Sequence, residues 1–391
     1  MSKTANRFSP EARKRAVRPV PGNGNRRTSR GHVDMMAVQA PAGFTPVLPA
    51  GTAVTTALIL HVGPHKTGTT ALQQALAENA GRLMPLGILY PQTGRVGTSH
   101  PALAEACRTG DGARLHALAA EAGGWRTVIL SSENFAMLDS RALAELRTLF
   151  PRAEVRVSYT LRRLATLWPA HWAELVKHGQ EPGFDGYLDR VAARDDTPFR
   201  APVLPLRQVR RLADAFGCDT LRISLHEARS GPGQDIGPAF IDDLLGLGHE
   251  APHFATMRVN ITPTAQETAL VRLMNLQVAG RATYPEKQSL RLALLDALRE
   301  DPPDWLADFD AALGRARQLV LSSSLPLVAS EQAEVVKLYG DLMLDAAEDY
   351  LSPVETAVPL FGPADLSPGL RAEIAAFIDG LPRQPRAGGT W

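Results

Sequence analysis

Short apolar runs alternate with amphipathic segments between about residue 55 and residue 225. Five of these runs have the length and composition of buried strands, and they are 57–62, 87–90, 127–130, 155–161 and 220–225. The segments 69–80, 141–150 and 164–175 carry apolar residues three or four positions apart, which is the spacing of one helical face. Strands separated by helices predict an α/β fold, in which a parallel β-sheet is flanked by helices.

The last third of the chain is predicted to be helical. Thr262 and Pro263 form an N-cap and first-turn pair for a helix that runs to about Gln277. Ser330 is expected to begin another helix, whose apolar positions continue to Ala346. A helical C-terminal third therefore follows the predicted sheet.

The two ends of the chain differ from its middle. Residues 1–50 mix Arg, Pro, Gly, Ser and Asn without sustained periodicity, and we expect them to be a disordered basic leader. The first 30 residues hold nine Lys/Arg and one acid, whereas the rest of the chain holds 33 basic and 40 acidic residues. The body therefore has no general preference for polyanions, and no nucleic-acid partner is expected. We expect one α/β domain over 55–352 and a C-terminal extension over 353–391, partly helical and then loose.

The cysteines and the hydropathy of the chain indicate which kinds of protein it is not expected to be. Cys107 and Cys218 are far apart and lack ligand-like spacing, so neither a disulfide framework nor a metal site is expected. The apolar runs are too short to span a bilayer, and the leader lacks the apolar core of a signal peptide. These features predict a cytoplasmic protein without a membrane span.

The strongest candidate for chemistry is the segment Gly63-Pro64-His65-Lys66-Thr67-Gly68-Thr69-Thr70, between the first strand and the first helix. Backbone N–H groups of such a loop can surround an anion, and the helix N-terminus adds partial positive charge. Lys66 supplies a full charge, while Thr67, Thr69 and Thr70 supply hydroxyl donors. In a nucleoside-triphosphate loop the lysine directly follows the last glycine, whereas Lys66 precedes Gly68 here. A P-loop nucleotide kinase or NTPase is therefore the second interpretation.

This loop resembles the 5′-phosphosulfate loop of the sulfotransferases, whose bacterial members often have Gly-x-x-Lys-Thr-Gly-Thr-Thr. The resemblance covers most of residues 56–350, and further segments are similar in the family's order. These segments are Gly87–Pro91, Ser131–Phe135, Leu161–Arg163 with Trp168–Trp172, His226-Glu227, and Val259–Thr262 before a helix containing Asn275. The resemblance implies a P-loop NTPase-like sulfotransferase fold. It also implies sulfuryl transfer from 3′-phosphoadenosine-5′-phosphosulfate to a hydroxyl or amine of a small-molecule, carbohydrate or lipid acceptor, without a metal.

The resemblance also assigns residues to the sulfuryl donor. The donor-binding residues would be Gly63, His65, Lys66, Thr67, Gly68, Thr69, Thr70 and Arg162. Lys66 would offset the charge that develops on the leaving phosphate, and Arg162 would hold the 3′-phosphate. The family usually has a serine eight residues after that arginine, but this chain has Ala170. This departure leaves open a non-catalytic sulfotransferase-like binding protein, or a neighbour such as His171 taking over the lost bond.

Two residues are candidates for the general base. His100 follows the second strand, where several similar sulfotransferases place their base, but it could also be an ordinary loop residue. Glu133 follows the third strand and could act as base, orient the acceptor or cap the next helix. Trp168 and Trp172 lie one helical turn apart, and we predict both to be core residues, as we do His61. No motif identifies the acceptor or the oligomeric state.

Overall fold

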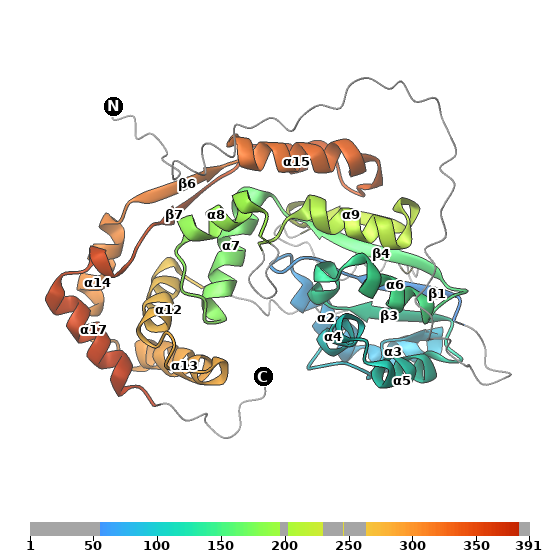
Figure 1. Ribbon diagram of the computed structural model, residues 1–391, viewed down its shortest axis with the longest axis horizontal. Coiled ribbons are helices and arrows are strands. Elements are labelled where there is room, and N and C mark those ends of the chain that lie inside the picture. Colours follow the sequence, from blue (N-terminus) through green and yellow to red (C-terminus); the bar gives the residue numbers. More distant parts are fainter. Residues whose placement is uncertain (1–54, 196–201, 230–244, 246–262, 383–391) are drawn as a thin grey trace.

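The computed structural model describes residues 55–195, 202–229, 245 and 263–382 (Figure 1). The expected disordered leader, the end of the C-terminal extension and the segment Val259–Thr262 lie outside these residues.

Five parallel strands form the main sheet in the order β2-β3-β1-β4-β5. Their bounds are β1 Ala57–His61, β2 Ile88–Leu89, β3 Thr127–Ser131, β4 Glu154–Leu161 and β5 Leu221–Leu225. The structure therefore confirms the predicted parallel sheet, with each strand in its expected segment. The second strand is shorter than predicted, because only two of its residues pair with β3.

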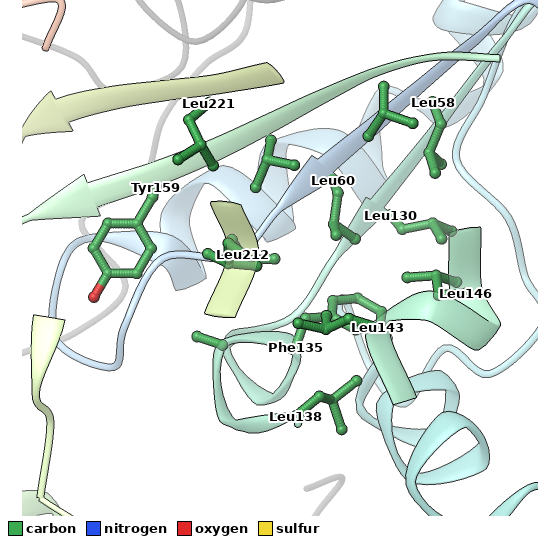
Figure 2. Packing of buried hydrophobic residues seen from close by; sticks show 14 of the residues in the cluster. Leu58, Leu60, Leu130, Phe135, Leu138, Leu143, Leu146, Tyr159, Leu212 and Leu221 are labelled. Carbon is green, nitrogen blue, oxygen red and sulfur yellow. The ribbon is translucent and has the colours of Figure 1, made fainter. Parts of the chain in front are cut away.

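Alternate residues of the central strand β1 face two different cores. Leu58 and Leu60 belong to a large cluster that includes the apolar faces of helices α4 (Pro101–Thr109), α5 (Gly112–Ala122), α6 (Ser140–Thr148) and α9 (Pro205–Phe216). Figure 2 shows part of this cluster, including Leu143 and Leu146 of α6 and Leu212 of α9. Ile59 points the other way and packs with Leu72 and Leu76 of helix α2. A strand that is buried on both faces must be apolar at every position, which explains the unbroken run in the sequence.

The helices around the sheet include the three that the sequence predicted. The predicted segments 69–80, 141–150 and 164–175 correspond to α2 Thr69–Glu78, α6 Ser140–Thr148 and α7 Leu164–Lys177. The other helices of this part are α3 Ala80–Leu83, α4 Pro101–Thr109, α5 Gly112–Ala122, α8 Phe184–Ala193, α9 Pro205–Phe216 and α10 His226–Arg229.

The C-terminal part is mostly helical, as predicted, and it has its own apolar core around α7 and α12 (Figure 1). Its helices are α12 Ala265–Gln277, α13 Tyr284–Glu300, α14 Leu306–Arg315, α15 Pro326–Tyr339, α16 Ala347–Leu351 and α17 Pro368–Gly380. The structure adds an antiparallel strand pair, β6 Gln318–Ser322 and β7 Glu355–Pro359, which the sequence did not predict.

Two predicted helix starts were wrong. Helix α12 begins after Thr264, not at Thr262. The Thr264 hydroxyl accepts the N–H of Glu267, and the Glu267 carboxylate accepts the N–H of Thr264, so this reciprocal capping box fixes the start. Helix α15 begins at Pro326, and Ser330 lies within it.

Residue 352 does not separate two packing units. Strand β7 lies beyond this position, yet it pairs with β6, which lies before it. Ile374 and Ile378 of α17 are buried in the same core as helices α7 and α12. Residues 353–382 of the expected extension therefore pack with the helical part.

The lengths and hydropathy of the helices can be compared with those that a membrane span requires. Within residues 55–195, 202–229 and 263–382, each helix is too short or too polar to cross a bilayer.

Candidate functional site

The candidate residues gather at one edge of the sheet. Strands β1, β3, β4 and β5 run in the same direction, so their carboxyl ends lie at the same edge. The segments that follow these ends contain the loop 62–68, Glu133, Arg162 and Glu227. Ligands of open α/β sheets bind at this edge, and hydrogen bonds there join residues up to 96 positions apart in the sequence.

The loop after β1 has an unusual backbone. Lys66 has a φ of 70°, in the left-handed region, and Gly68, which is the N-cap of α2, has a φ of 82°. A residue with a Cβ pays about 1–2 kcal/mol for this conformation. The Thr67 hydroxyl donates to the Pro64 carbonyl over 2.8 Å and holds the turn closed. Strain of this kind at a lysine is typical of a functional position, where the surrounding structure imposes it.

The Lys66 side chain forms an ion pair that the sequence did not predict. Its Nζ lies 2.6 Å from Oε2 of Glu174 on helix α7, and both side chains are mostly buried. Glu174 also contacts Lys177 and His178. Burial alone would raise the pKa of Glu174, but the His178 hydrogen bond and the charges of Lys66 and Lys177 hold it far below its ordinary value. An ionised carboxylate therefore neutralises the loop lysine.

Arg162 lies against the same loop. Its Nη1 donates to the Lys66 carbonyl over 2.7 Å, and its Nε donates to the Thr166 hydroxyl over 3.2 Å. Burial lowers the pKa of Arg162, while the nearby Glu227 carboxylate raises it in part. The structure thus brings together the two cations, Lys66 and Arg162, that the sequence had assigned to one ligand.

Glu133 is tied to helix α2 and does not cap the short helix that follows it. The Thr69 hydroxyl donates to Glu133 Oε1, and Gln73 Nε2 donates to Oε2 over 3.1 Å. The cap of the following turn is Ser132 instead. Burial alone would raise the pKa of Glu133, but His65 and these two hydrogen bonds hold it below its ordinary value. Glu133 is therefore an ionised carboxylate that fixes the first turns of α2.

His100 is buried, with 0% of its surface exposed. Its Nε2 lies 3.0 Å from the Pro91 carbonyl, and its Nδ1 lies 3.2 Å from the Ser131 amide, which donates to it. Burial lowers the pKa of His100 to about 4. A buried ring held by backbone groups on both nitrogens bridges two segments of the sheet edge. These contacts fit a structural role for His100, and its assignment as general base stays a prediction.

His65 of the loop contacts His171 of helix α7. The two rings stack with centroids 6.1 Å apart, and His171 Nδ1 lies 3.0 Å from the Tyr187 hydroxyl. Burial, with a smaller contribution from His65, lowers the pKa of His171 to about 3. His171 is therefore a buried, neutral histidine that is bonded to Tyr187 through Nδ1. His65 lines the loop, as the sequence predicted.

The remaining aromatic and histidine predictions are confirmed as core positions. Trp168 is fully buried, and its Nε1 donates to the Val203 carbonyl over 2.9 Å. Trp172 donates to the Pro182 carbonyl over 3.1 Å. His61 is buried, and its Nδ1 is hydrogen-bonded to the Ser131 hydroxyl over 2.7 Å.

The buried histidines predict an acid-sensitive fold. The unfolded chain binds a proton at each histidine below a pH of about 6.5. Burial lowers the folded-state pKa of His61 and His100 to about 4 and that of His171 to about 3. Their stabilising contribution is therefore complete above about pH 6.5 and is lost as the pH falls toward 4.

Urea unfolding between pH 8 and pH 4.5 measures this effect. We expect the free energy of unfolding to fall steadily below pH 6.5, and to fall less steeply in His100→Gln. Replacing the exposed His116 with Gln is the matched control and should leave the slope unchanged. An unfolding free energy that does not change between pH 6.5 and 4.5 would contradict the assigned histidine states.

Neither a search for metal ligands nor a comparison with known proteins gives further information on this site. Within the part of the chain that the structure describes, no three His, Cys, Asp or Glu side chains are grouped as metal ligands would be. Comparison of the chain with protein-family models and with curated proteins returned no match. The function is therefore argued from the geometry of the site.

Proposed function

We propose that this chain is a sulfotransferase, which moves a sulfuryl group from 3′-phosphoadenosine-5′-phosphosulfate to a hydroxyl or amine. The acceptor would be a small molecule, a carbohydrate or a lipid. One observation carries the proposal. The strained loop with Lys66 joins the central strand β1 to α2, and Arg162, which follows the neighbouring strand β4, donates a hydrogen bond to the Lys66 carbonyl. The proposal includes the P-loop NTPase-like sulfotransferase fold, which the strand–loop–helix order supports.

The loop fits a phosphate or sulfate group. A Cβ added at Gly63 would lie 2.9 Å from Thr69 Cγ2 and 3.0 Å from Thr67 Oγ1, so the side chains of these two threonines pack directly against the Gly63 backbone. Gly63, Thr67 and Gly68 would present N–H groups, while Thr69 and Thr70 begin α2, whose N-terminus favours an anion. His65 and Lys66 would bind the same group from the side of the loop.

In the proposed reaction, the bond from sulfur to the bridging phosphate oxygen breaks as the acceptor oxygen or nitrogen bonds to sulfur. Such transfers are loose, in-line displacements, and the protein mainly positions the groups and stabilises charge. Lys66 would leave Glu174 and offset the charge on the departing phosphate. Glu174 keeps Lys177 and His178 as partners, so its charge remains compensated after Lys66 moves.

The acceptor's proton would pass to a carboxylate near Lys66. Glu174 fits this role best, since it lies 2.6 Å from Lys66 Nζ and its side chain is 15% exposed. Its low pKa makes it a weak base, but in a loose displacement the proton leaves after bonding to sulfur has made it strongly acidic. Glu133, the other candidate from the sequence, would position Thr69 and the start of α2.

Gly63→Ala tests whether the loop must fold this closely. We expect about tenfold weaker binding of adenosine 3′,5′-bisphosphate, because the new methyl group displaces Thr67 and Thr69. Gly81→Ala is the matched control, since a Cβ at that helical position meets nothing within 4 Å. Calorimetric titration of both variants measures the difference. Equal affinities in the two variants would show that the loop does not bind the nucleotide.

A turnover assay tests the proposed reaction. The full chain would be incubated with donor labelled in the sulfuryl group and with a phenol, an arylamine, a monosaccharide and a glycolipid. We expect the label to move to at least one acceptor class, with release of one bisphosphate for each sulfuryl group transferred. Binding of the bisphosphate without any transfer would instead support the non-catalytic interpretation that Ala170 left open.

A further inference from the structure

A carboxylate of helix α10, which directly follows β5, lies at the N-terminus of helix α7. Oε1 of Glu227 accepts the backbone N–H of Arg163 over 3.1 Å and the hydroxyl of Thr166 over 3.3 Å. Arg163 is the N-cap of α7, and Thr166 is in its first turn. This end of a helix attracts anions, and here the protein itself supplies one.

The same carboxylate is linked to Arg162. Arg162 Nε donates to the Thr166 hydroxyl, which in turn contacts Glu227. The charge of Glu227 also raises the pKa of the arginine against the effect of burial. The guanidinium that we assign to the 3′-phosphate of the donor therefore already has a negative charge nearby.

Among the described residues, the second carboxylate oxygen of Glu227 has no hydrogen-bond partner. Oε2 is buried and has no hydrogen-bond donor among the described residues. A ribose hydroxyl could donate to this oxygen, whereas a fully ionised phosphate has no proton to donate and is repelled by its charge. Ala170 lies on the same face of α7, one turn after Thr166, and has no hydroxyl to help hold a phosphate.

We infer that Glu227 determines the specificity for the 3′ substituent of the nucleotide: it opposes a 3′-phosphate beside Arg162 and accepts a hydrogen bond from a ribose hydroxyl. The chain then discriminates only weakly between adenine nucleotides with a 3′-phosphate and those with a 3′-hydroxyl. This inference rests on the proposed function, because that function places the 3′ substituent at Arg162.

Calorimetric titration of adenosine 3′,5′-bisphosphate and adenosine 5′-monophosphate tests the inference. Glu227→Gln keeps the shape of the side chain and an oxygen that can accept from Arg163 and Thr166, but it removes the charge. We expect this variant to bind the bisphosphate about tenfold more tightly than the wild type does, without tighter binding of the monophosphate. Glu227→Ala should shift selectivity in the same direction, which keeps the test valid if either variant is unstable.

Glu154→Gln is the matched control. It changes the charge by the same amount, but it lies at the opposite end of β4 and is exposed. We expect it to leave both affinities unchanged. If the Glu227 variants change both affinities by the same factor, or neither, Glu227 does not select the 3′ substituent. If the folded wild type binds neither nucleotide, the proposed function fails and the inference fails with it.

Discussion

We expect Lys66→Ala to slow sulfuryl transfer by at least ~10²-fold, which is the scale for removing one electrostatic stabiliser of a transition state. Lys66 is the cation of the strained loop, and the proposed mechanism gives it the charge that develops on the leaving phosphate. The fold should persist, because Glu174 retains Lys177 and His178 as partners and the loop lysine adds little to the core. Single-turnover rates with saturating donor, together with melting temperatures, measure both effects.

Lys177→Ala is the control for this experiment. Lys177 is also a partner of Glu174, at 3.4 Å, but it lies on helix α7 outside the loop. Its loss disturbs the same carboxylate without removing the loop charge, so we expect a rate within a few-fold of the wild type. Turnover close to the wild-type rate in Lys66→Ala would show that this loop does not carry the reaction.

The second large effect is expected at Arg162. Arg162→Ala should weaken the binding of adenosine 3′,5′-bisphosphate by tenfold or more, since a hydrogen bond to a charged group contributes about 1.5–3 kcal/mol. Binding of the 5′-monophosphate should change much less, because it lacks the 3′ group. Loss of the bond to the Lys66 carbonyl loosens the loop for both nucleotides, so the difference between them is the informative quantity.

Ala170→Ser tests the same subsite in the opposite direction. Position 170 lies between Thr166 and Glu174 on one face of α7, and its side chain is buried. A hydroxyl there should tighten bisphosphate binding about tenfold, which corresponds to ~1.4 kcal/mol, and leave the monophosphate unchanged. Equal changes for the two nucleotides in both variants would place the 3′-phosphate elsewhere.

Much of the sheet could be predicted because its strands are buried on both faces. Such strands are rich in apolar residues, and each is bounded by turn residues or by a helix. The strand pair β6 and β7 was missed for the opposite reason. Its residues are mostly part-exposed, so the apolar run is short, and its partner lies more than thirty residues away. Strands that pair at such a distance along the chain produce no recognisable pattern in the local sequence.

The candidate site was predictable only where one segment contains it. The loop 63–70 is such a segment, and Arg162 follows directly from the end of its strand. Glu174 was missed because its partner Lys66 lies on another segment, although an acid on a largely apolar helix was a visible signal. The surroundings of His100 could not be predicted, because the sequence does not show that backbone groups of Pro91 and Ser131 contact its ring.

The central claim is that the loop and Arg162 form a site for a sulfuryl donor, not for a nucleoside triphosphate. The most direct test is thermal stabilisation of the full chain by adenosine 3′,5′-bisphosphate, compared with ATP plus magnesium at the same concentrations. A ligand present at 100 times its dissociation constant stabilises the folded state by about 2.7 kcal/mol. We predict that the bisphosphate raises the melting temperature by several degrees and that ATP plus magnesium raises it much less. A larger shift with ATP plus magnesium would contradict the account and favour a nucleotide kinase or NTPase.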